Sequence, residues 1–552
     1  MKYFSALLLF SCLATSGYGQ TYDVVIRNGT LYDGTGAAPT VGDLALRGSR
    51  IAAVGKFPGR GKREIDARGM AVAPGFVNML SHAYISLLRD GRSLSDIRQG
   101  VTLEVFGEVS MGPLSESMKA EMQQQQDEEK FDISWTTLGE FMRHLEQKGV
   151  ATNFASFVSA SEIREHELGQ INRPPTPVEL ERMKALVAQA MEEGAMGLTT
   201  ALIYVPATFA KTDELVALAH VARQYGGIFT AHMRSEGDRL EAAVDEMIEI
   251  RKRAMIPVEI YHLKAAGKAN WPKLDRVIAK IDSARRAGLF ISANMYNYTA
   301  GATGLDAAMP PWVQEGGLQA WRERLQDTET RQKVGKAMTE PAGDWENLAL
   351  AAGPEGMILQ GFKQDSLRKY VGKTLAEVAA QRGHSWYETA MDLVVMDDSR
   401  VGTAYFLMSE ENVKKQIALP YLSFGSDAAS IAPEGSSLKR SPHPRTYGNF
   451  ARLLGKYVRE EKVISLAEAI SRLTMQPCSN LDIPDRGALR TGYFADVVIF
   501  DPARIGDRAT FEQPHQLAEG VIDVFVNGTQ VLKNGESTGA MPGRAVYGPG
   551  KK

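Results

Sequence analysis

The most constraining feature of this sequence is an alternation, between residues 73 and 427, of short apolar runs with segments of helical periodicity. Strands that alternate with helices form parallel βα units, and eight such units close into a barrel. Eight runs are present: Ala73–His82, Val101–Glu108, Asn153–Ser159, Gly197–Tyr204, Ile228–His232, Val258–His262, Leu289–Tyr296 and Tyr421–Asp427. The sequence therefore predicts an α/β fold built on a TIM-like (β/α)8 barrel.

Strand-like sequence patterns at both ends of the chain predict a second, smaller domain. Short β-type runs separated by Asn-Gly and Gly-Ser turns fill residues 20–72, and the same style returns only within 483–552. We therefore expect the two ends to form one β domain together. Residues 73–482 are left for the barrel.

One gap interrupts the rhythm of the barrel. Residues 300–384 contain three tryptophans and several Gly and Pro, and helical text resumes only at Ser385. An insertion after a barrel strand falls on the face where active sites lie, so we expect a lid or a wall of the substrate pocket. A helical excursion with no role in the site is the alternative.

Charge and cysteine content exclude several classes of protein. Lys and Arg number 63 against 66 Asp and Glu, and the net charge of −3 supplies no basic field for nucleic acid. Two cysteines, Cys12 and Cys478, cannot form a disulfide framework. No segment beyond the N-terminal region is apolar over the length of a membrane span.

The N-terminus is typical of an export signal. Lys2 precedes an apolar run and then small residues up to Gly19, which predicts a signal peptide over residues 1–19 and a periplasmic or secreted protein. A buried first helix is one alternative. A lipoprotein cleavage box ending at Cys12, which would anchor the chain to a membrane, is another.

Polar residues stand where predicted strands end, and such ends meet on one rim of a barrel. His232 and His262 close strands that are one βα unit apart, so a divalent metal could bind both imidazoles. Glu108 closes the second strand and would add an anionic oxygen. Asp427 closes the eighth, beside the first, and is placed for general acid–base chemistry, although a helix cap is the alternative.

Other side chains near these ends are candidates for binding substrate. Lys264 and Arg445 could hold a substrate carboxylate, and Tyr296 follows the seventh strand. His82 ends the first strand and is a candidate ligand for a second metal, or a hydrogen-bond donor beside the first.

Several motifs together resemble the amidohydrolase superfamily, and within it the N-acyl-D-amino-acid deacylases, or D-aminoacylases. The resemblance implies a distorted (β/α)8 barrel with a β-sandwich from both chain ends, and zinc bound by His232 and His262. It also implies Asp427 as the catalytic acid and base, and Lys264, Tyr296 and Arg445 as carboxylate-binding residues. The motifs are Ala73-Pro74-Gly75-Phe76-Val77, Ala231-His232-Met233-Arg234-Ser235-Glu236-Gly237-Asp238, His262-Leu263-Lys264, Gly425-Ser426-Asp427 and His443-Pro444-Arg445.

Two departures from the family pattern bear on the metal. Leu80 stands where the superfamily has the first histidine of His-x-His, and an apolar side chain cannot bind a metal. Glu108 stands where D-aminoacylases have a cysteine, and it is a harder but competent zinc ligand. We therefore expect one zinc, held by Glu108, His232 and His262, and a weak second site at most around His82.

The predicted function is zinc-dependent hydrolysis of the amide bond of N-acyl-D-amino acids or of peptides with a D residue. The substrate is then a small molecule or short peptide with a carboxylate. One alternative is a related amidohydrolase acting on a cyclic amide or an L-dipeptide. Another is a secreted binding protein that has lost catalysis. The sequence leaves the oligomeric state open.

Overall fold

A computed structural model describes residues 21–126 and 129–552. The predicted signal peptide at residues 1–19, with Cys12 in it, lies outside the described residues. Within the described ranges, every helix is too short or too polar to cross a bilayer.

The barrel has the eight predicted strand positions. Parallel ladders run in two arcs, and the third strand is divided at Phe157 into β8 and β9. The seam between the last and first strands closes through two backbone bonds, Asp427 N–H to the Leu80 carbonyl (2.9 Å) and His82 N–H to the Ala428 carbonyl (3.0 Å). The strands are β6 (Phe76–Ser81), β7 (Val101–Phe106), β8 (Asn153–Ser156), β9 (Val158–Ser159), β10 (Gly197–Ala201), β11 (Ile228–His232), β12 (Val258–Ile260), β13 (Ile291–Met295) and β17 (Leu422–Phe424).

Helices cover the outside of the barrel, and their ends follow from local sequence. Helix α6 begins with a Thr176 capping box and Pro177 in its first turn, and ends at the left-handed Gly194. Helix α8 turns Leu240, Val244 and Met247 into the core, as their spacing predicts. The helices of this layer include α4 (Leu138–Lys148), α6 (Pro177–Glu193), α7 (Thr212–Gln224), α8 (Leu240–Ala254), α9 (Lys273–Arg286), α17 (Arg445–Arg452) and α18 (Leu466–Leu473).

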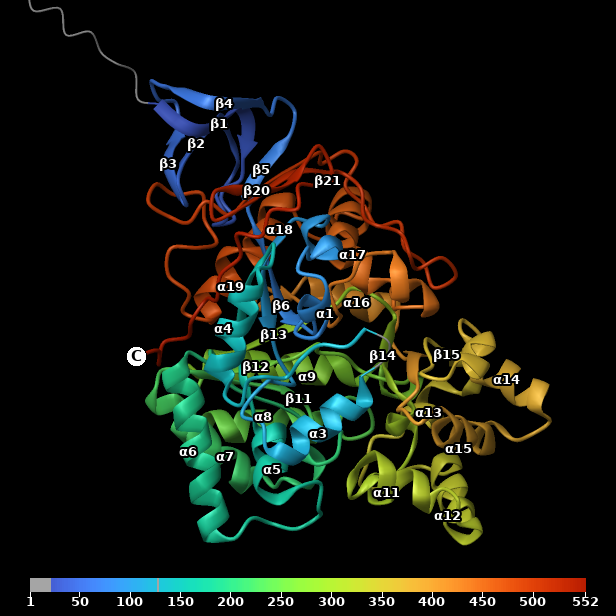
Figure 1. Cartoon of the computed structure of the whole chain (residues 1–552). Coiled ribbons are helices and arrows are strands. Elements are labelled where there is room, and N and C mark those ends of the chain that lie inside the picture. Colours follow the sequence, from blue (N-terminus) through green and yellow to red (C-terminus); the bar gives the residue numbers. More distant parts are fainter. Residues whose placement is uncertain (1–20, 127–128) are drawn as a thin grey trace, which may run out of the picture.

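The two chain ends form one β domain above the barrel, as predicted (Figure 1). Strand β5 pairs antiparallel with β18, with Val72 opposite Ile499. A shared apolar core from both ends, with Ile26, Leu44 and Phe525 fully or almost fully buried, joins the layers. The strands are β1 (Thr21–Leu31), β2 (Thr40–Arg47), β3 (Arg50–Gly55), β4 (Arg60–Asp66), β5 (Ala71–Pro74), β18 (Val497–Phe500), β19 (Val521–Val526), β20 (Thr529–Lys533) and β21 (Glu536–Ser537).

The last residues correct the expectation that all of 483–552 belongs to the β domain. Beyond residue 540 the chain runs along the floor of the barrel, the side at which the barrel strands begin. Its C-terminal end lies beside the barrel in Figure 1. Phe154 N–H donates to the Arg544 carbonyl (3.1 Å), and Val546 N–H donates to the Phe154 carbonyl (2.7 Å). Gly543 permits the approach, because a Cβ there would lie 2.0 Å from the Thr152 carbonyl oxygen.

The predicted insertion is a folded lobe that extends further than residue 384. Strands β14 (Ala300–Gly304), β15 (Met357–Leu359) and β16 (Gly402–Phe406) form its sheet. Helix α15 (Trp386–Asp397) packs Ala390, Leu393 and Val394 into the core of this lobe, so the insertion spans about 300–408. The remaining helices of the lobe are α10 (Pro311–Gln314), α11 (Gly317–Arg324), α12 (Thr328–Thr339), α13 (Leu348–Ala352) and α14 (Leu375–Arg382).

Candidate metal centre

Strand ends of the barrel bring the predicted site residues to one rim. Glu108 follows β7, His262 follows β12 and Asp427 follows β17, and all three have left-handed backbones with φ of 63°, 32° and 50°. Such conformations are uncommon for these residue types and cluster at functional sites. The local strain turns each side chain into the mouth of the barrel.

Glu108, His232 and His262 form a compact set of metal-binding atoms. Oε1 of Glu108 lies 3.1 Å from Nδ1 of His232 and 2.7 Å from Nε2 of His262. All three residues are buried. Two imidazoles and one carboxylate are a donor set that zinc accepts, so these residues fit the expected metal.

Electrostatics keep Glu108 in the form that binds a cation. Burial alone raises the pKa of a carboxyl group, but hydrogen bonds from His232 and His262 outweigh it and hold the pKa of Glu108 well below its usual range. The carboxylate is therefore ionised at neutral pH.

Glu236 is a residue of this site to which the sequence analysis gave no role. Its Oε1 lies 2.9 Å from Nδ1 of His262, and its Oε2 lies 3.7 Å from Nε2 of His232. These nitrogens face away from Glu108. The carboxylate lies within hydrogen-bond distance of His262 and beside His232, whose Nε2 has no hydrogen-bond partner among the described residues. The signal was an acid four residues after a strand-end histidine, in the motif His232-Met-Arg-Ser-Glu236.

Lys264 lies next to His262, on the side of the ring that faces away from Glu108. Its Nζ is 2.6 Å from Oε1 of Glu236 and 2.7 Å from Nδ1 of His262. The side chain is almost fully buried, so the ammonium compensates the charge of Glu236. The sequence predicts that Lys264 binds a substrate carboxylate. In the structure its ammonium is also paired with Glu236.

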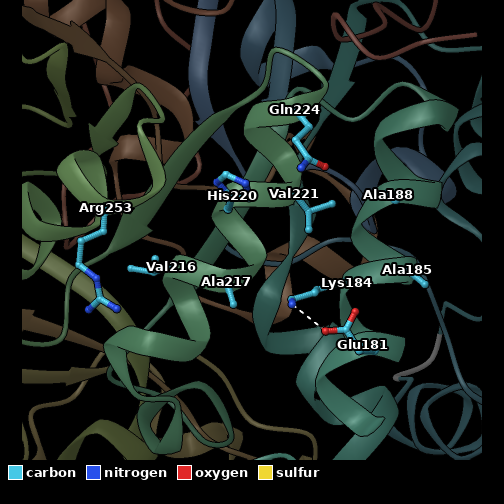
Figure 2. A pocket seen from close by; sticks show the side chains of 10 residues that line it. All are labelled: Glu181, Lys184, Ala185, Ala188, Val216, Ala217, His220, Val221, Gln224 and Arg253. Atoms are coloured by element: carbon cyan, nitrogen blue, oxygen red, sulfur yellow. Dashed lines mark hydrogen bonds and ion pairs between the residues drawn. The ribbon is translucent and has the colours of Figure 1, made fainter. Parts of the chain in front are cut away.

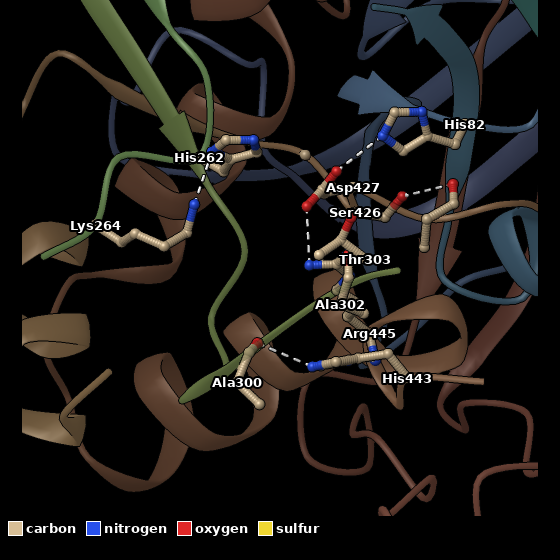
Figure 3. A network of polar contacts seen from close by, with 12 residues as sticks. His82, His262, Lys264, Ala300, Ala302, Thr303, Ser426, Asp427, His443 and Arg445 are labelled. Carbon is tan, nitrogen blue, oxygen red and sulfur yellow. Dashed lines mark hydrogen bonds and ion pairs between the residues drawn. The ribbon is translucent and has the colours of Figure 1, made fainter. Parts of the chain in front are cut away.

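Asp427 lies between His82 and Arg445 (Figure 3). Its Oδ1 is 2.9 Å from Nε2 of His82, and its Oδ2 is 2.9 Å from Nη1 of Arg445. Burial raises the pKa of Asp427, but the guanidinium of Arg445 and the hydrogen bond with His82 lower it to about 2. Asp427 is therefore a carboxylate that can accept a proton.

A second group of three donors shares Glu108 with the first. His82, Glu108 and Asp427 bring one ligand atom each within 4.8 Å of one another. Leu80 adds no ligand to this group: it is fully buried, and a Cβ added at Gly425 would lie 2.9 Å from the Leu80 Cβ. The first strand thus contributes packing at the position where the family has a ligand.

Tyr296 and Arg445, both expected at a substrate carboxylate, lie in contact with each other. The ring of Tyr296 lies 4.4 Å from the Arg445 guanidinium carbon and 5.4 Å from Nζ of Lys264. Within the described part of the chain, Nε and Nη1 of Arg445 make no aligned hydrogen bond. Nη1 is engaged by the ion pair with Asp427, which leaves Nε as the donor able to bind a substrate anion.

A cleft of about 1640 Å³ opens above the centre, between the barrel and the insertion lobe. His82, Asp427 and Arg445 line its base, and Trp321 and Phe362 of the lobe line its wall. The lobe therefore forms a wall of the pocket. A separate hollow of about 590 Å³ between α6 and α7 (Figure 2) contains none of the metal-binding residues.

Comparisons with known proteins agree with this geometry. A sequence model of the amidohydrolase family matches residues 63–532. D-aminoacylase of Alcaligenes xylosoxydans xylosoxydans is 31% identical over 96% of this chain and 98% of its own length. N-acyl-D-aspartate deacylase of the same organism is 30% identical over 96% of this chain and 95% of its own length.

Solved structures are similar over the same extent. A D-aminoacylase described by one-metal activation and second-metal attenuation of a binuclear centre has a TM-score of 0.80 and 29% identity, covering 95% of this chain and all of that one. N-acyl-D-glutamate deacylase of Bordetella bronchiseptica, with zinc and a phosphonate mimic of the tetrahedral intermediate, has a TM-score of 0.78 and 28% identity, covering 96% and 100%.

Proposed function

Because the chain belongs to the amidohydrolase family, we propose that it is a zinc-dependent hydrolase of the amide bond in N-acyl-D-amino acids, or in peptides with a D residue. The products are a carboxylate and a free amino acid. The observation that carries this proposal is the cluster of Glu108, His232 and His262 directly beside Asp427, which lies at the base of the cleft.

The residues of the chain divide the work. Glu108, His232 and His262 would hold zinc, which when bound would supply Lewis acidity to the scissile carbonyl and lower the pKa of water. Asp427 accepts a proton from the attacking water and returns it to the leaving nitrogen. His82 holds one oxygen of Asp427 and Arg445 holds the other, which fixes the carboxylate at the base of the cleft.

Arg445, Lys264 and Tyr296 are proposed to hold the α-carboxylate of the substrate. Nε of Arg445 supports this role, because a buried donor without a partner among the described residues gains most from an anion. Holding the carboxylate fixes which face of the amide meets the metal, and so selects between enantiomers.

A paired panel tests the proposal. Purified protein is assayed with N-acyl-D and N-acyl-L forms of several amino acids, with zinc measured per chain and activity compared before and after chelation. We expect hydrolysis of D substrates that is lost with zinc and restored by it. Equal rates on both enantiomers would remove the D-specific part of the proposal.

We also propose that the mature protein lies outside the cytoplasm, on the support of residues 1–19 alone. N-terminal sequencing of protein from its native host decides this point. A mature chain that starts at Gln20 supports a cleaved signal, a lipidated Cys12 supports a membrane anchor, and retained Met1 contradicts both.

A further inference from the structure

Two arginines approach one short strand of the insertion lobe at neighbouring residues. Nη2 of Arg445 lies 3.5 Å from the carbonyl oxygen of Ala302, and Nη2 of Arg400 lies 3.3 Å from Oγ1 of Thr303. Neighbouring residues of a strand are about 3.4 Å apart along its axis. The two guanidinium groups, one from the barrel and one from the lobe, therefore line the same part of the cleft.

The backbone fixes where Arg400 stands. It lies in the turn between α15 and β16, where Asp398 and Val401 both have left-handed backbones, with φ of 52° and 53°. The Arg400 carbonyl accepts a hydrogen bond from Leu305 N–H (2.7 Å). A turn constrained in this way presents its side chain in one direction.

The guanidinium of Arg400 is held on one side and open on the other. Nη2 bonds Oδ2 of Asp306 at 2.6 Å, and the guanidinium carbon lies 5.1 Å from the ring centre of Tyr204. Nε and Nη1 have no hydrogen-bond partner within residues 21–126 and 129–552. The side chain is 54% exposed, against 5% for Arg445. Nη2 carries the contacts with Asp306 and Thr303, so the N–H groups of Nη1 and Nε remain to donate single hydrogen bonds to an anion.

One aromatic ring separates Arg400 from the metal centre. The ring of Tyr204 lies 5.5 Å from the ring of His232 and packs against Arg400. Tyr204 O–H also donates to Oγ1 of Thr303 (2.8 Å), which fixes this spacer against the strand that both arginines approach. A substrate whose amide lies at the metal can thus reach Arg400 with a second group.

We propose that Arg400 is a specificity-determining residue that binds a second carboxylate of the substrate, besides the α-carboxylate assigned to Arg445. This inference rests on the proposed amide hydrolysis. The second carboxylate is carried either by the side chain of the amino acid or by the acyl group. Asp306 keeps the guanidinium in place through Nη2, and Nη1 and Nε are left to donate to the substrate.

Two matched pairs of substrates test the proposal with the zinc-loaded full chain. N-acetyl-D-glutamate is compared with N-acetyl-D-glutamine, and N-succinyl-D-leucine with its terminal amide. For at least one pair we expect a kcat/KM at least about tenfold higher with the charged member, as a charge-assisted hydrogen bond gives. The pair that responds identifies which part of the substrate carries the carboxylate.

Variants assign the preference to this residue. Arg400→Gln should abolish it and leave the rate on the neutral member near that of the wild type, which also shows that the variant folds. Arg331→Gln is the matched control, because Arg331 forms a comparable ion pair with Asp392 (2.7 Å) on lobe helices that do not line the cleft. It should keep the preference.

Two results would overturn the inference. One is a wild type that prefers neither charged member, and the other is an equal loss on charged and neutral members in Arg400→Gln. If no substrate is hydrolysed, the proposed function fails by itself. Calorimetric binding of N-acetyl-D-glutamate and N-acetyl-D-glutamine then tests Arg400 directly: a preference that Arg400→Gln removes supports its role, and equal binding contradicts it.

Discussion

At the scale of single residues, Asp427 bears the proposed proton transfers. Asp427→Asn keeps the volume of the side chain but removes the base, so kcat should fall by about 10²- to 10⁴-fold, the usual size of a general acid–base contribution. Zinc content should not change, because Glu108, His232 and His262 are untouched. Kinetics and metal analysis on one preparation check both points; near-normal turnover would contradict the assignment.

Variants of Glu108 test whether a carboxylate serves as the metal ligand where the D-aminoacylase pattern has a cysteine. Glu108→Gln should weaken zinc binding by more than about tenfold, since even an outer partner of a ligand is worth that much. Glu108→Cys should restore binding. Glu104→Gln, at a buried carboxyl of the same strand that bonds Ser81 and Thr152, is the control and should bind zinc normally. Competition with a chromogenic chelator measures all three.

Glu236 should act through the imidazoles that it contacts. Its carboxylate lies 2.9 Å from the outward nitrogen of His262 and 3.7 Å from that of His232, so it fixes the direction in which the His262 ring presents its other nitrogen. Glu236→Gln should lower zinc affinity by about 10- to 100-fold. Glu241→Gln, at a surface pair with Arg276, should leave it unchanged; equal affinity in both variants would show that Glu236 only packs.

Sequence reasoning found most of these residues because strand ends share a rim. Each of these residues ends a predicted strand: Glu108, His232, His262 and Asp427. The carboxyl ends of the parallel strands of a barrel all lie on one rim, so the residues were expected to lie close together. Glu236 was missed because it lies in a loop, where direction depends on backbone angles that no periodicity records. The same limit applies to Lys264, whose ion pair with Glu236 comes from two different loops.

At the scale of elements, the strands were predictable and the extent of the lobe was not. Alternation of apolar runs with helical text indicated all eight strand positions. Ser385 and Glu388 form a capping box, and α15 begins there, where the sequence predicts that helical periodicity resumes. A capping box states where a helix starts, however, and not which core receives its apolar face. Helix α15 packs into the core of the lobe, whereas the sequence predicts that the lobe ends at residue 384.

The contact between lobe and barrel should depend on pH. Oε1 of Glu346, in the lobe, accepts a hydrogen bond from the N–H of Glu236 (3.1 Å). Burial, with the nearby charge of Glu236, raises the pKa of Glu346 to about 7 from an unfolded value of 4.5. The folded state therefore holds a proton that the unfolded state has lost, and the stability of this contact falls as pH rises from 4.5 to 7.

Hydrogen exchange measures this effect. Protection factors of residues 235–238, corrected for the intrinsic pH dependence of exchange, should be lower at pH 8 than at pH 5.5. Glu346→Gln keeps an oxygen that accepts the same hydrogen bond but cannot ionise, so its protection should be equal at both values. A wild type with equal protection at both values would refute the prediction.

At the scale of the whole molecule, both chain ends complete structures that begin elsewhere. The N-terminal strands need β18, and the floor of the barrel needs residues after 540. Val546 is almost completely buried there, beside Val77, Met196 and Ile228. The β-type runs at both ends of the chain correctly predicted that their strands form one domain. The segment after residue 540 has no alternation of apolar and polar residues that would predict its packing on the barrel.

Removal of this segment should destabilise the protein without touching the metal centre. Val546→Ala should cost about 1 to 2 kcal/mol from lost apolar burial, and a chain ending at residue 539 should lose more. Both should bind zinc as the wild type does. Urea unfolding and zinc titration provide the two readouts. A truncated chain with an unchanged unfolding midpoint would show that the floor needs no such cover.

The same closure of the floor has a consequence for biosynthesis. While the chain is still growing, the apolar inner ends of the first barrel strands have no cover, because the residues that pack on them are translated some 400 positions later. Contacts so distant along the chain make folding slow and leave intermediates prone to aggregation. The newly made protein should therefore depend on chaperones far more than the finished one does, and soluble yield in overproducing cells should rise when translation is slowed.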